Sequence, residues 1–363
     1  MTILLTVTND LTYDQRMQRI CGSLAEHGYQ VMLIGRTLPH SIPLKTRQFQ
    51  QKRLSCRFKK GFVFYAEYNI RLFFFLLFHR RWDAVCAIDL DTICAVYAAS
   101  VLRRKKRVFD AHEYFTEVPE VVGRPFVKGF WQMVANFLVP RFRHAYTVGP
   151  ALAGIFKELY HVDFKVVRNV PLPQTIESKK VISHPETILY QGALNEGRGI
   201  EQLLVALKDL EGVRLQLAGE GDLSEKLRKL AVTLGVEEKV EFLGLIEPEP
   251  LKKYTRDAWL CVNLLEHRGA SYYYSLANKF FDAVQAGTPV LTMNFPEYKT
   301  LNEQFEVAVL LPDLDPVHIS QAIRTLQGSP EQYNMLIINC LKASKRWNWK
   351  VEEQTLLELW KAL

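Results

Sequence analysis

The feature that most constrains the fold is an alternation of short apolar runs with longer helical segments. Ile3–Val7 form an apolar run of strand length, a helical segment extends to His27, and Val31–Gly35 form a second run. A strand, a helix and a second strand in this order predict a parallel sheet, because the chain must cross back before the second strand begins. The pattern begins again at Thr187–Gln191. We therefore predict an α/β protein with two Rossmann-like, doubly wound domains.

Two parts of the first half carry weaker patterns. Residues 37–60 are basic and irregular and predict a connection without regular structure. Phe62–Tyr65 is aromatic and β-branched, which favours a strand, and we expect a helix over Asn69–Arg81. Further strands are expected at Ala84–Ile88, Val108–Phe109, Ala145–Val148, Val166–Pro171, Val213–Gly219, Val240–Gly244 and Trp259–Leu264.

A shift in composition at residues 171–185 suits a domain boundary. This segment contains three prolines and the pair Lys179-Lys180, which favour an extended linker. We therefore expect an N-terminal domain over 1–170 and a C-terminal domain over 171–346. With 363 residues and 48% hydrophobic composition, the chain is long enough to bury two cores.

The apolar runs predict neither a membrane span nor a secretion signal. Leu72–Phe78 is shorter than the roughly 20 residues that cross a bilayer, and Arg71 and Arg80 flank it. No basic region precedes the first apolar run. The six cysteines are scattered without a Cys-x-x-Cys pair, which is typical of reduced thiols in a cytosolic protein. We therefore expect a cytoplasmic location.

Charge is divided unequally between the two halves. Residues 1–170 carry 25 Lys and Arg against 13 Asp and Glu, a net of +12, whereas residues 171–363 carry 21 against 26, a net of −5. A basic half indicates an anionic partner. No nucleic-acid-binding motif is present, so nucleic acid is not expected. Basic and aromatic residues alternate at 71–82 and 124–143, which favours docking on the anionic inner face of the cell membrane. The alternative is that both segments are amphipathic core helices.

The stretch Ser271–Met293 says most about function. It opens with small polar residues, continues with apolar residues at helical spacing and ends at Gly287, before a short strand at Val290–Met293. The start of a helix in an α/β sheet favours anions, because its backbone N–H groups are free. Lys279 and Asp282 lie one turn apart there, as a diphosphate and sugar hydroxyls would require. The alternative is an ordinary surface pair on a buried helix.

Glycines and a histidine mark two other strand ends. Gly192 to Gly199 form a glycine-rich turn that contains Arg198, a side chain suited to a phosphate. Gly219 ends a later strand in the same half, where a tight turn is the alternative. In the first half, His112 follows a strand and lies beside Asp110 and Glu113. This position in an α/β sheet favours a ligand-binding role over a merely hydrogen-bonded loop histidine.

Asp89 and Asp91 are separated by one residue, a spacing found in some metal sites, but we expect another role for them. They precede a helix that starts near Thr92, so Asp91 is expected to cap that helix. No other hard oxygen ligands occur at suitable spacing, and we therefore expect neither a metal site nor a metal cofactor.

The segment Ser275-Leu-Ala-Asn-Lys-Phe-Phe-Asp-Ala-(x)3-Gly-Thr-Pro-Val resembles the donor-binding segment of the glycosyltransferase family 4 group. It is most similar to the bacterial subgroup whose motif is Ser-Leu-Pro-Asn-Lys-x-Phe-Glu. The two glutamates of the family fall on Tyr274 and Asp282. Asp110-Ala-His-Glu113 is similar to the Asp-x-His-Glu segment of the same subgroup. Of the two basic residues usual in the glycine-rich turn, Ala193 replaces the first and Arg198 matches the second.

The resemblance implies the GT-B fold, in which two Rossmann-like domains face each other across a cleft and a C-terminal helix, here 347–363, crosses back to the first domain. It implies a retaining, metal-independent transfer of a sugar from a nucleotide diphosphate sugar to a lipid-linked or cell-surface glycan acceptor. His112, Arg198 and Lys279 would carry the chemistry. Contacts to the donor would come from Gly192, Arg198, Gly199, Gly219, Leu245, Ser275, Asn278, Lys279 and Asp282, and contacts on the acceptor side from Asn9, Asp14 and Glu113.

Two other functions suit the same sequence. A sugar-nucleotide epimerase on this fold would use the same donor without an acceptor. A catalytically inactive nucleotide-sugar-binding protein would explain why Tyr274 and Ala193 stand where the family has a glutamate and a basic residue.

Overall fold

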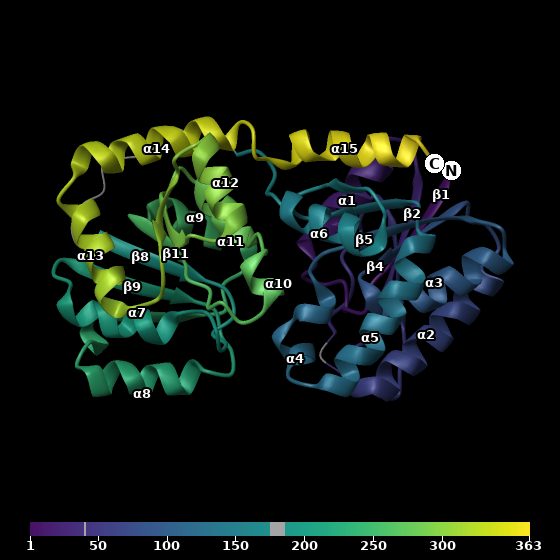
Figure 1. Cartoon of the computed structure of the whole chain (residues 1–363), viewed down its shortest axis with the longest axis horizontal. Coiled ribbons are helices and arrows are strands. Elements are labelled where there is room, and N and C mark those ends of the chain that lie inside the picture. The colour runs from purple at the N-terminus through teal and green to yellow at the C-terminus, as the bar shows by residue number, and fades with distance from the viewer. Residues whose placement is uncertain (40, 175–185) are drawn as a thin grey trace. The chain divides into compact units, whose positions relative to one another are not determined.

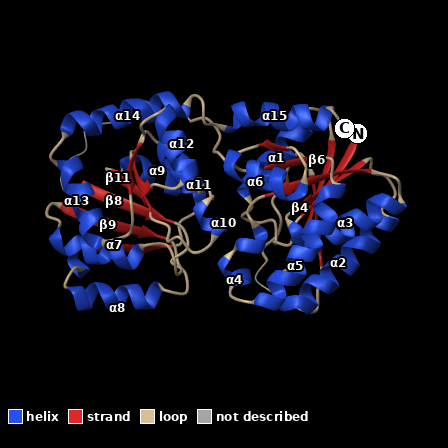
Figure 2. Cartoon of the chain, in the orientation of Figure 1, coloured by secondary structure: helices blue, strands red, loops and turns tan. Residues whose placement is uncertain are grey.

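A computed structural model describes residues 1–39, 41–174 and 186–363 (Figure 1). The chain divides into two compact units. Unit 1 comprises Met1–Arg168 and Glu352–Leu363, and unit 2 comprises Asn169–Val351. Each unit is built on its own parallel sheet flanked by helices (Figure 2). Residues 175–185 of the expected linker lie outside the described residues.

Unit 1 contains a seven-stranded parallel sheet with the order β3-β2-β1-β4-β5-β6-β7. The central strands β1 and β4 consist almost entirely of buried residues, as expected for a parallel sheet with both faces covered. The strands are β1 (Thr2–Thr6), β2 (Gln30–Arg36), β3 (Gln50–Leu54), β4 (Ala84–Ile88), β5 (Lys106–Ala111), β6 (His144–Thr147) and β7 (Phe164–Val166). The helices are α1 (Gln15–Glu26), α2 (Gly61–Phe78), α3 (Leu90–Leu102), α4 (Pro119–Val122), α5 (Pro125–Leu138) and α6 (Pro150–Tyr160).

Unit 2 contains a six-stranded parallel sheet with the order β10-β9-β8-β11-β12-β13. Its strands are β8 (Glu186–Gln191), β9 (Val213–Ala218), β10 (Val240–Gly244), β11 (Leu260–Asn263), β12 (Val290–Met293) and β13 (Ala308–Leu311). Its helices are α7 (Ile200–Ala206), α8 (Ser224–Leu234), α9 (Pro248–Asp257), α10 (Ala270–Tyr273), α11 (Asn278–Gln285), α12 (Pro296–Gln304), α13 (Pro316–Gln327) and α14 (Pro330–Ser344). The two parallel sheets confirm the predicted α/β, doubly wound fold class.

The last helix, α15 (Trp349–Lys361), begins in unit 2 and continues in unit 1. The Trp349 backbone N–H donates to the Pro171 carbonyl at 2.8 Å. Farther along, the Ser23 hydroxyl on α1 donates to the buried Glu353 carboxylate at 2.6 Å. The Trp360 side chain is only 1% exposed. Residues from both ends of the chain therefore build the core of unit 1.

The strand predicted at Phe62–Tyr65 is wrong, because α2 spans Gly61–Phe78 as one helix. Its buried residues are Phe64, Tyr68, Leu72 and Leu76. A buried residue at every fourth position is a helical stripe, and packing of this stripe outweighs the β propensity of the aromatic residues. By length and composition α2 is the one helix in the described residues that could cross a membrane, a test that the core helix of a soluble protein also passes.

The expectation of an irregular connection over 37–60 is also wrong, because β3 lies within it. The sequence Gln50-Gln-Lys-Arg-Leu54 is polar, and the strand pairs on one side only, with β2. Strands at the edge of a sheet often carry charged residues, which discourage pairing with other chains. An apolar pattern therefore does not reveal such a strand.

Two glycines of unit 2 bring the loops after β8 and β9 into backbone contact. At Gly219 an added Cβ would lie 1.9 Å from the Gly192 carbonyl oxygen, and φ is +152°, a value that residues with a side chain rarely adopt. Only glycine fits at this point. By contrast, a Cβ added at Gly154 in α6 would meet no atom within 4 Å.

We expect Gly219→Ala to destabilise unit 2 by about 1–3 kcal/mol or more, because the methyl group must displace a backbone carbonyl. Urea unfolding followed by fluorescence would measure the loss. Gly154→Ala is the matched control and should be neutral or stabilising by up to about 1 kcal/mol, since alanine favours the helix. Equal stability of the two variants would contradict the close contact.

Candidate functional site

The glycine-rich loop after β8 holds Arg198 at the carboxyl edge of the sheet in unit 2. Gly197 and Gly199, on either side of Arg198, both have positive φ. At Gly199 an added Cβ would lie 2.7 Å from the Leu264 Cβ, so this loop packs tightly against the end of β11. The Arg198 guanidinium lies over the Tyr272 ring, 5.0 Å from its centroid. Within the described ranges, its buried Nε has no hydrogen-bond partner.

Lys279 reaches the same region from the first turn of α11. Its Nζ lies over the Tyr190 ring, 4.0 Å from the centroid, and 3.5 Å from the place where a Cβ on Gly192 would stand. Burial and, to a lesser degree, the charge of Arg198 lower the pKa of Lys279 to about 7. Two cations thus act on each other, and in the described part of the chain no ion pair is found for either. A bound anion would stabilise both.

Asp282 lies on α11 one turn from Lys279, but its contact is with another residue. Its Oδ2 accepts a hydrogen bond from Gln191 Nε2 at 3.1 Å, and Gln191 Oε1 accepts one from the Thr255 hydroxyl at 2.8 Å. This chain of contacts ties α11 and α9 to the end of β8. The carboxylate of Asp282 therefore remains near the carboxyl edge of the sheet.

The helix expected to start near Ser275 begins at Asn278, which moves its first free N–H groups. The four-residue helix α10 ends at Tyr273, and α11 begins only at Asn278. In the turn between them, the Ser275 hydroxyl donates to the Tyr272 carbonyl at 2.8 Å, and the Ala277 N–H donates to the Tyr298 hydroxyl at 2.9 Å. The free N–H groups thus belong to the turn that starts at Asn278. Gly287 ends this segment with φ +70°, as the sequence predicts.

The predicted donor residues are only partly brought together. Gly192, Gly219, Arg198 and Lys279 lie at one place, and Gly199 shapes the loop that carries Arg198. Leu245, in the loop after β10, is 83% exposed. Sequence reasoning missed the two aromatic rings beneath the cations, Tyr190 and Tyr272.

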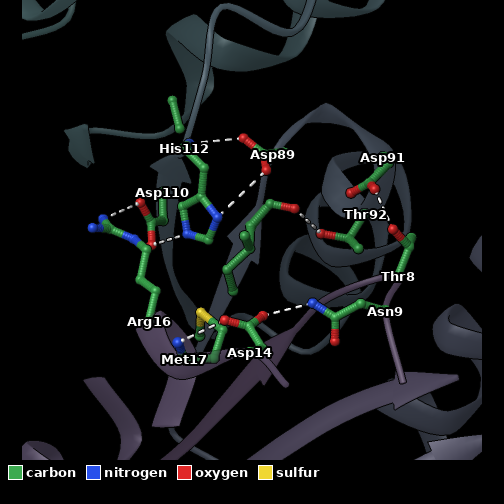
Figure 3. A network of polar contacts seen from close by, with 12 residues as sticks. Thr8, Asn9, Asp14, Arg16, Met17, Asp89, Asp91, Thr92, Asp110 and His112 are labelled. Atoms are coloured by element: carbon green, nitrogen blue, oxygen red, sulfur yellow. Dashed lines mark hydrogen bonds and ion pairs between the residues drawn. The ribbon is translucent and has the colours of Figure 1, made fainter. Parts of the chain in front are cut away.

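In unit 1, His112 follows β5 and lies between two carboxylates (Figure 3). His112 Nε2 is 2.9 Å from Asp110 Oδ2, and Nδ1 is 3.7 Å from Asp89 Oδ2. The His112 backbone N–H also donates to Asp89 Oδ1 at 2.8 Å. Behind this pair, the buried Arg16 donates to Asp110 Oδ1 at 3.0 Å and to the Val167 carbonyl at 2.9 Å. The imidazole is therefore held on both sides.

The charges of this network favour a protonated histidine. Burial alone would lower the pKa of His112, but the charges of Asp110 and Asp89 outweigh it and raise the pKa to about 9. Burial would raise the pKa of Asp110, yet the neighbouring cations Arg16 and His112 keep it below its usual value. Sequence reasoning found His112 but missed Arg16, because a buried arginine on an amphipathic helix looks like an ordinary surface cation.

The predicted acceptor-side residues take different places. Asn9 donates to Asp14 at 2.6 Å, and Asp14 accepts from the Met17 N–H at 2.9 Å as the N-cap of α1 (Figure 3). Both residues therefore shape the loop after β1. Glu113 is exposed in the loop after β5.

The expectation that Asp91 caps α3 is wrong. Asp89 occupies the N-cap position with φ +56°, and Asp91 lies in the first turn. There its carboxylate accepts a hydrogen bond from the Thr8 hydroxyl at the end of β1. Burial, more than any neighbouring charge, raises the pKa of Asp91 to about 6. In the described ranges, no group of three or more His, Cys, Asp or Glu side chains could hold a metal ion.

The fold defined by these two sheets is that of the GT-B proteins. Over 99% of its length the chain matches 98% of a sucrose-phosphate synthase from Thermosynechococcus elongatus, with a TM-score of 0.79 and 16% identity. It also matches all of HepE from Anabaena in complex with UDP-glucose, over the whole of this chain, with a TM-score of 0.75 and 14% identity.

Residues 174–342 match the family described as Glycosyl transferases group 1. An uncharacterized glycosyltransferase from Methanocaldococcus jannaschii is 37% identical over 29% of this chain and 26% of its own length. A phosphatidyl-myo-inositol mannosyltransferase from Mycobacterium leprae is 25% identical over 49% of this chain and 47% of its own length. The chain thus spans at most about half the length of these curated relatives.

We expect the free energy of unfolding to fall by about 3 kcal/mol between pH 6.5 and 9 because of His112. The pKa of His112 is raised on folding, so its contribution is fully present below 6.5 and is lost as the pH rises through about 9. His112→Gln should remove this slope in urea unfolding. His144→Gln is the control, because burial lowers the pKa of His144, so its contribution to stability rises with pH and cannot produce the predicted fall. A slope that persists in His112→Gln would contradict this assignment.

Proposed function

We propose that the protein is a glycosyltransferase that takes its sugar from a nucleotide diphosphate sugar. The observation that carries the proposal is the pair Arg198 and Lys279. Both side chains lie beside the glycine-rich turns of unit 2, and neither has a carboxylate partner in the described residues. A diphosphate supplies two negative charges at the spacing of two neighbouring cations. It would also restore the full charge of Lys279, because a nearby anion raises a lysine pKa.

The same cations would serve the chemistry of transfer. When the bond between the anomeric carbon and the diphosphate breaks, negative charge grows on the leaving phosphate. Cations that are already in place stabilise that charge more than they stabilise the ground state. We propose that Asp282 binds hydroxyl groups of the nucleotide ribose and that His112, on unit 1, contacts the sugar or the acceptor. We also propose that the transfer retains the anomeric configuration and needs no divalent cation.

The comparisons support transfer over the other two functions. The relatives of known name are transferases, which favours transfer over epimerisation. HepE, which shares the fold, was solved with UDP-glucose. The cation pair would serve an inactive nucleotide-sugar-binding protein as well as an enzyme, so the names of the relatives are what favour transfer over this alternative.

We expect Lys279→Ala and Arg198→Ala each to slow transfer about 100-fold or more, since one lost electrostatic contact to the leaving group costs about 3 kcal/mol. A panel of UDP-, GDP- and dTDP-sugars, ranked by calorimetry, would first identify the donor, and release of its sugar would then be measured with and without excess EDTA. Lys299→Ala is the control, because this lysine is exposed on α12. Rates within a few-fold of wild type in both folded variants would contradict the proposed role of the two cations. Complete loss of activity in EDTA would contradict the proposal that transfer needs no divalent cation.

We further propose that unit 1 docks reversibly on an anionic membrane and meets a lipid-linked or surface-glycan acceptor there. The support is a surface of α2 and α5 on which large apolar side chains are exposed beside arginines. Its apolar residues are Phe62, Val63, Ile70, Phe74 and Phe78 of α2, and Phe126, Val127, Met133 and Phe137 of α5. Phe62 and Phe130 join the two helices, with ring centroids 5.3 Å apart. We call this the aromatic–basic surface.

The cations beside these residues include Arg80, Arg81 and Arg124, all exposed. Lys128 is less available, because it pairs with Glu117 at 2.5 Å. Exposed apolar patches of this extent mark interaction surfaces. A membrane suits the combination, since aromatic rings enter the interface while arginines contact anionic headgroups. The mannosyltransferase relative is named for a phosphatidylinositol substrate, which is consistent with a lipid acceptor.

We expect binding to vesicles that contain anionic lipid, and this binding should weaken as salt rises, because each basic residue contributes about 1 kcal/mol that salt screens. The triple variant Arg80→Glu, Arg81→Glu and Arg124→Glu should no longer co-sediment, yet it should bind the donor normally. Reversal of Lys229, Lys252 and Lys253, which are exposed on unit 2, is the control. If the wild-type protein does not co-sediment with anionic vesicles at low salt, the membrane proposal is ruled out.

A further inference from the structure

The strand order of unit 1 marks the place where a ligand of that unit is expected. From β1 the chain winds toward β2 and β3 on one side and from β4 onward toward β7 on the other. Strand order thus reverses between β1 and β4. Open parallel sheets bind their ligands beyond the carboxyl ends of the strands at this point. The residues there are Thr8 after β1 and Asp89 and Asp91 after β4, with His112 close by (Figure 3).

Asp91 has an unused acceptor at this position. Its side chain is 9% exposed, and one carboxylate oxygen accepts from the Thr8 hydroxyl. The other oxygen, Oδ1, is buried and has no hydrogen-bond partner among the described residues. Buried polar atoms are nearly always hydrogen-bonded, and an orphaned carboxylate oxygen is costly. It is therefore suited to a donor group that arrives with a ligand.

The neighbouring charges decide which donor group fits. The carboxylates of Glu113 and Asp89 act on Asp91, so a further negative charge would be repelled. The nearby cations have other partners: His112 lies between Asp110 and Asp89, and Arg16 pairs with Asp110. Arg36 donates to the Lys59 carbonyl at 3.0 Å. The site thus offers an acceptor to hydroxyl groups and little to a phosphate.

We propose that Asp91 binds a hydroxyl group of the acceptor, and that the end of the acceptor which receives the sugar is an uncharged sugar or polyol. This inference rests on the proposed transferase function and narrows its substrate. The hydroxyl donates its hydrogen bond to Asp91 Oδ1, while Thr8 holds the other oxygen. A lipid phosphate is then not the direct acceptor. An earlier reaction must have attached a sugar or polyol to the lipid or glycan that this protein extends.

The test offers three acceptors with the donor identified by calorimetry: vesicles with a monoglucosyl lipid, soluble methyl glucoside, and vesicles with a polyprenyl phosphate. Wild type should glycosylate a sugar hydroxyl and not the phosphate, and the first two acceptors show whether the hydroxyl must be membrane-bound. Asp91→Asn, of the same size, should raise the KM for the sugar acceptor about ten- to hundredfold and change donor hydrolysis less than twofold. Asp163→Asn, an exposed residue paired with Lys157, is the control.

The outcomes separate this inference from the function on which it rests. Transfer to the polyprenyl phosphate by wild type would overturn the inference and leave the transferase function intact. An unchanged acceptor KM in a folded Asp91→Asn variant would do the same. Failure of wild type to release sugar from every donor and to glycosylate every acceptor would overturn the proposed function, and the inference with it.

Discussion

Parallel strand pairing is the constraint on which the rest of the molecule depends. In a parallel sheet every strand points the same way, so all carboxyl ends lie at one edge and every connection must cross over the sheet. Helices then cover both faces, and the central strands β1 and β4 consist almost entirely of buried residues. Polar residues that follow strands can only gather at this edge. His112, Asp89 and Arg198 all lie in such loops.

The carboxyl edges of the two sheets differ in how their charged side chains are compensated. In unit 1, Arg16 forms an ion pair with Asp110, and His112 lies between Asp110 and Asp89. In unit 2, Arg198 and Lys279 lie over the Tyr272 and Tyr190 rings. The negative face of an aromatic ring attracts a cation but does not remove its charge. These four groups of the first edge thus compensate one another, whereas the second edge retains positive charge for a ligand.

The surface of α2 and α5 adds a second kind of constraint. A helix that exposes large apolar side chains gains little from them in water. One stripe of α2, which includes Tyr68 and Leu72, supplies the packing against the rest of unit 1, and the other stripe remains on the surface. The net charge of +12 over residues 1–170 accompanies this surface. One face of α2 therefore packs within unit 1, and the opposite face carries the surface on which the proposed docking rests.

The order of apolar runs determined the fold class, because period and length alone distinguish strands from the helices that connect them. The local sequence also predicted that a helix ends at Gly287 and that His112 and Arg198 follow strands. The sequence was misleading where a segment depends on its neighbours. Phe62–Tyr65 has β propensity but packs as a helix, and β3 is a polar strand because only its pairing with β2 defines it.

Only the tertiary structure decided how side chains distant in sequence meet. Arg16 and Asp110 are 94 residues apart, and Thr8 and Asp91 are 83 apart, so no local pattern can predict either contact. The pKa values of His112 and Lys279 follow from burial and from neighbouring charges, which exist only after folding. Residue type therefore determined which chemistry was available at each strand end. The packing of the sheets decided which of these groups are neutralised and which remain free to bind a ligand, because charge compensation depends on distance in space and not along the chain.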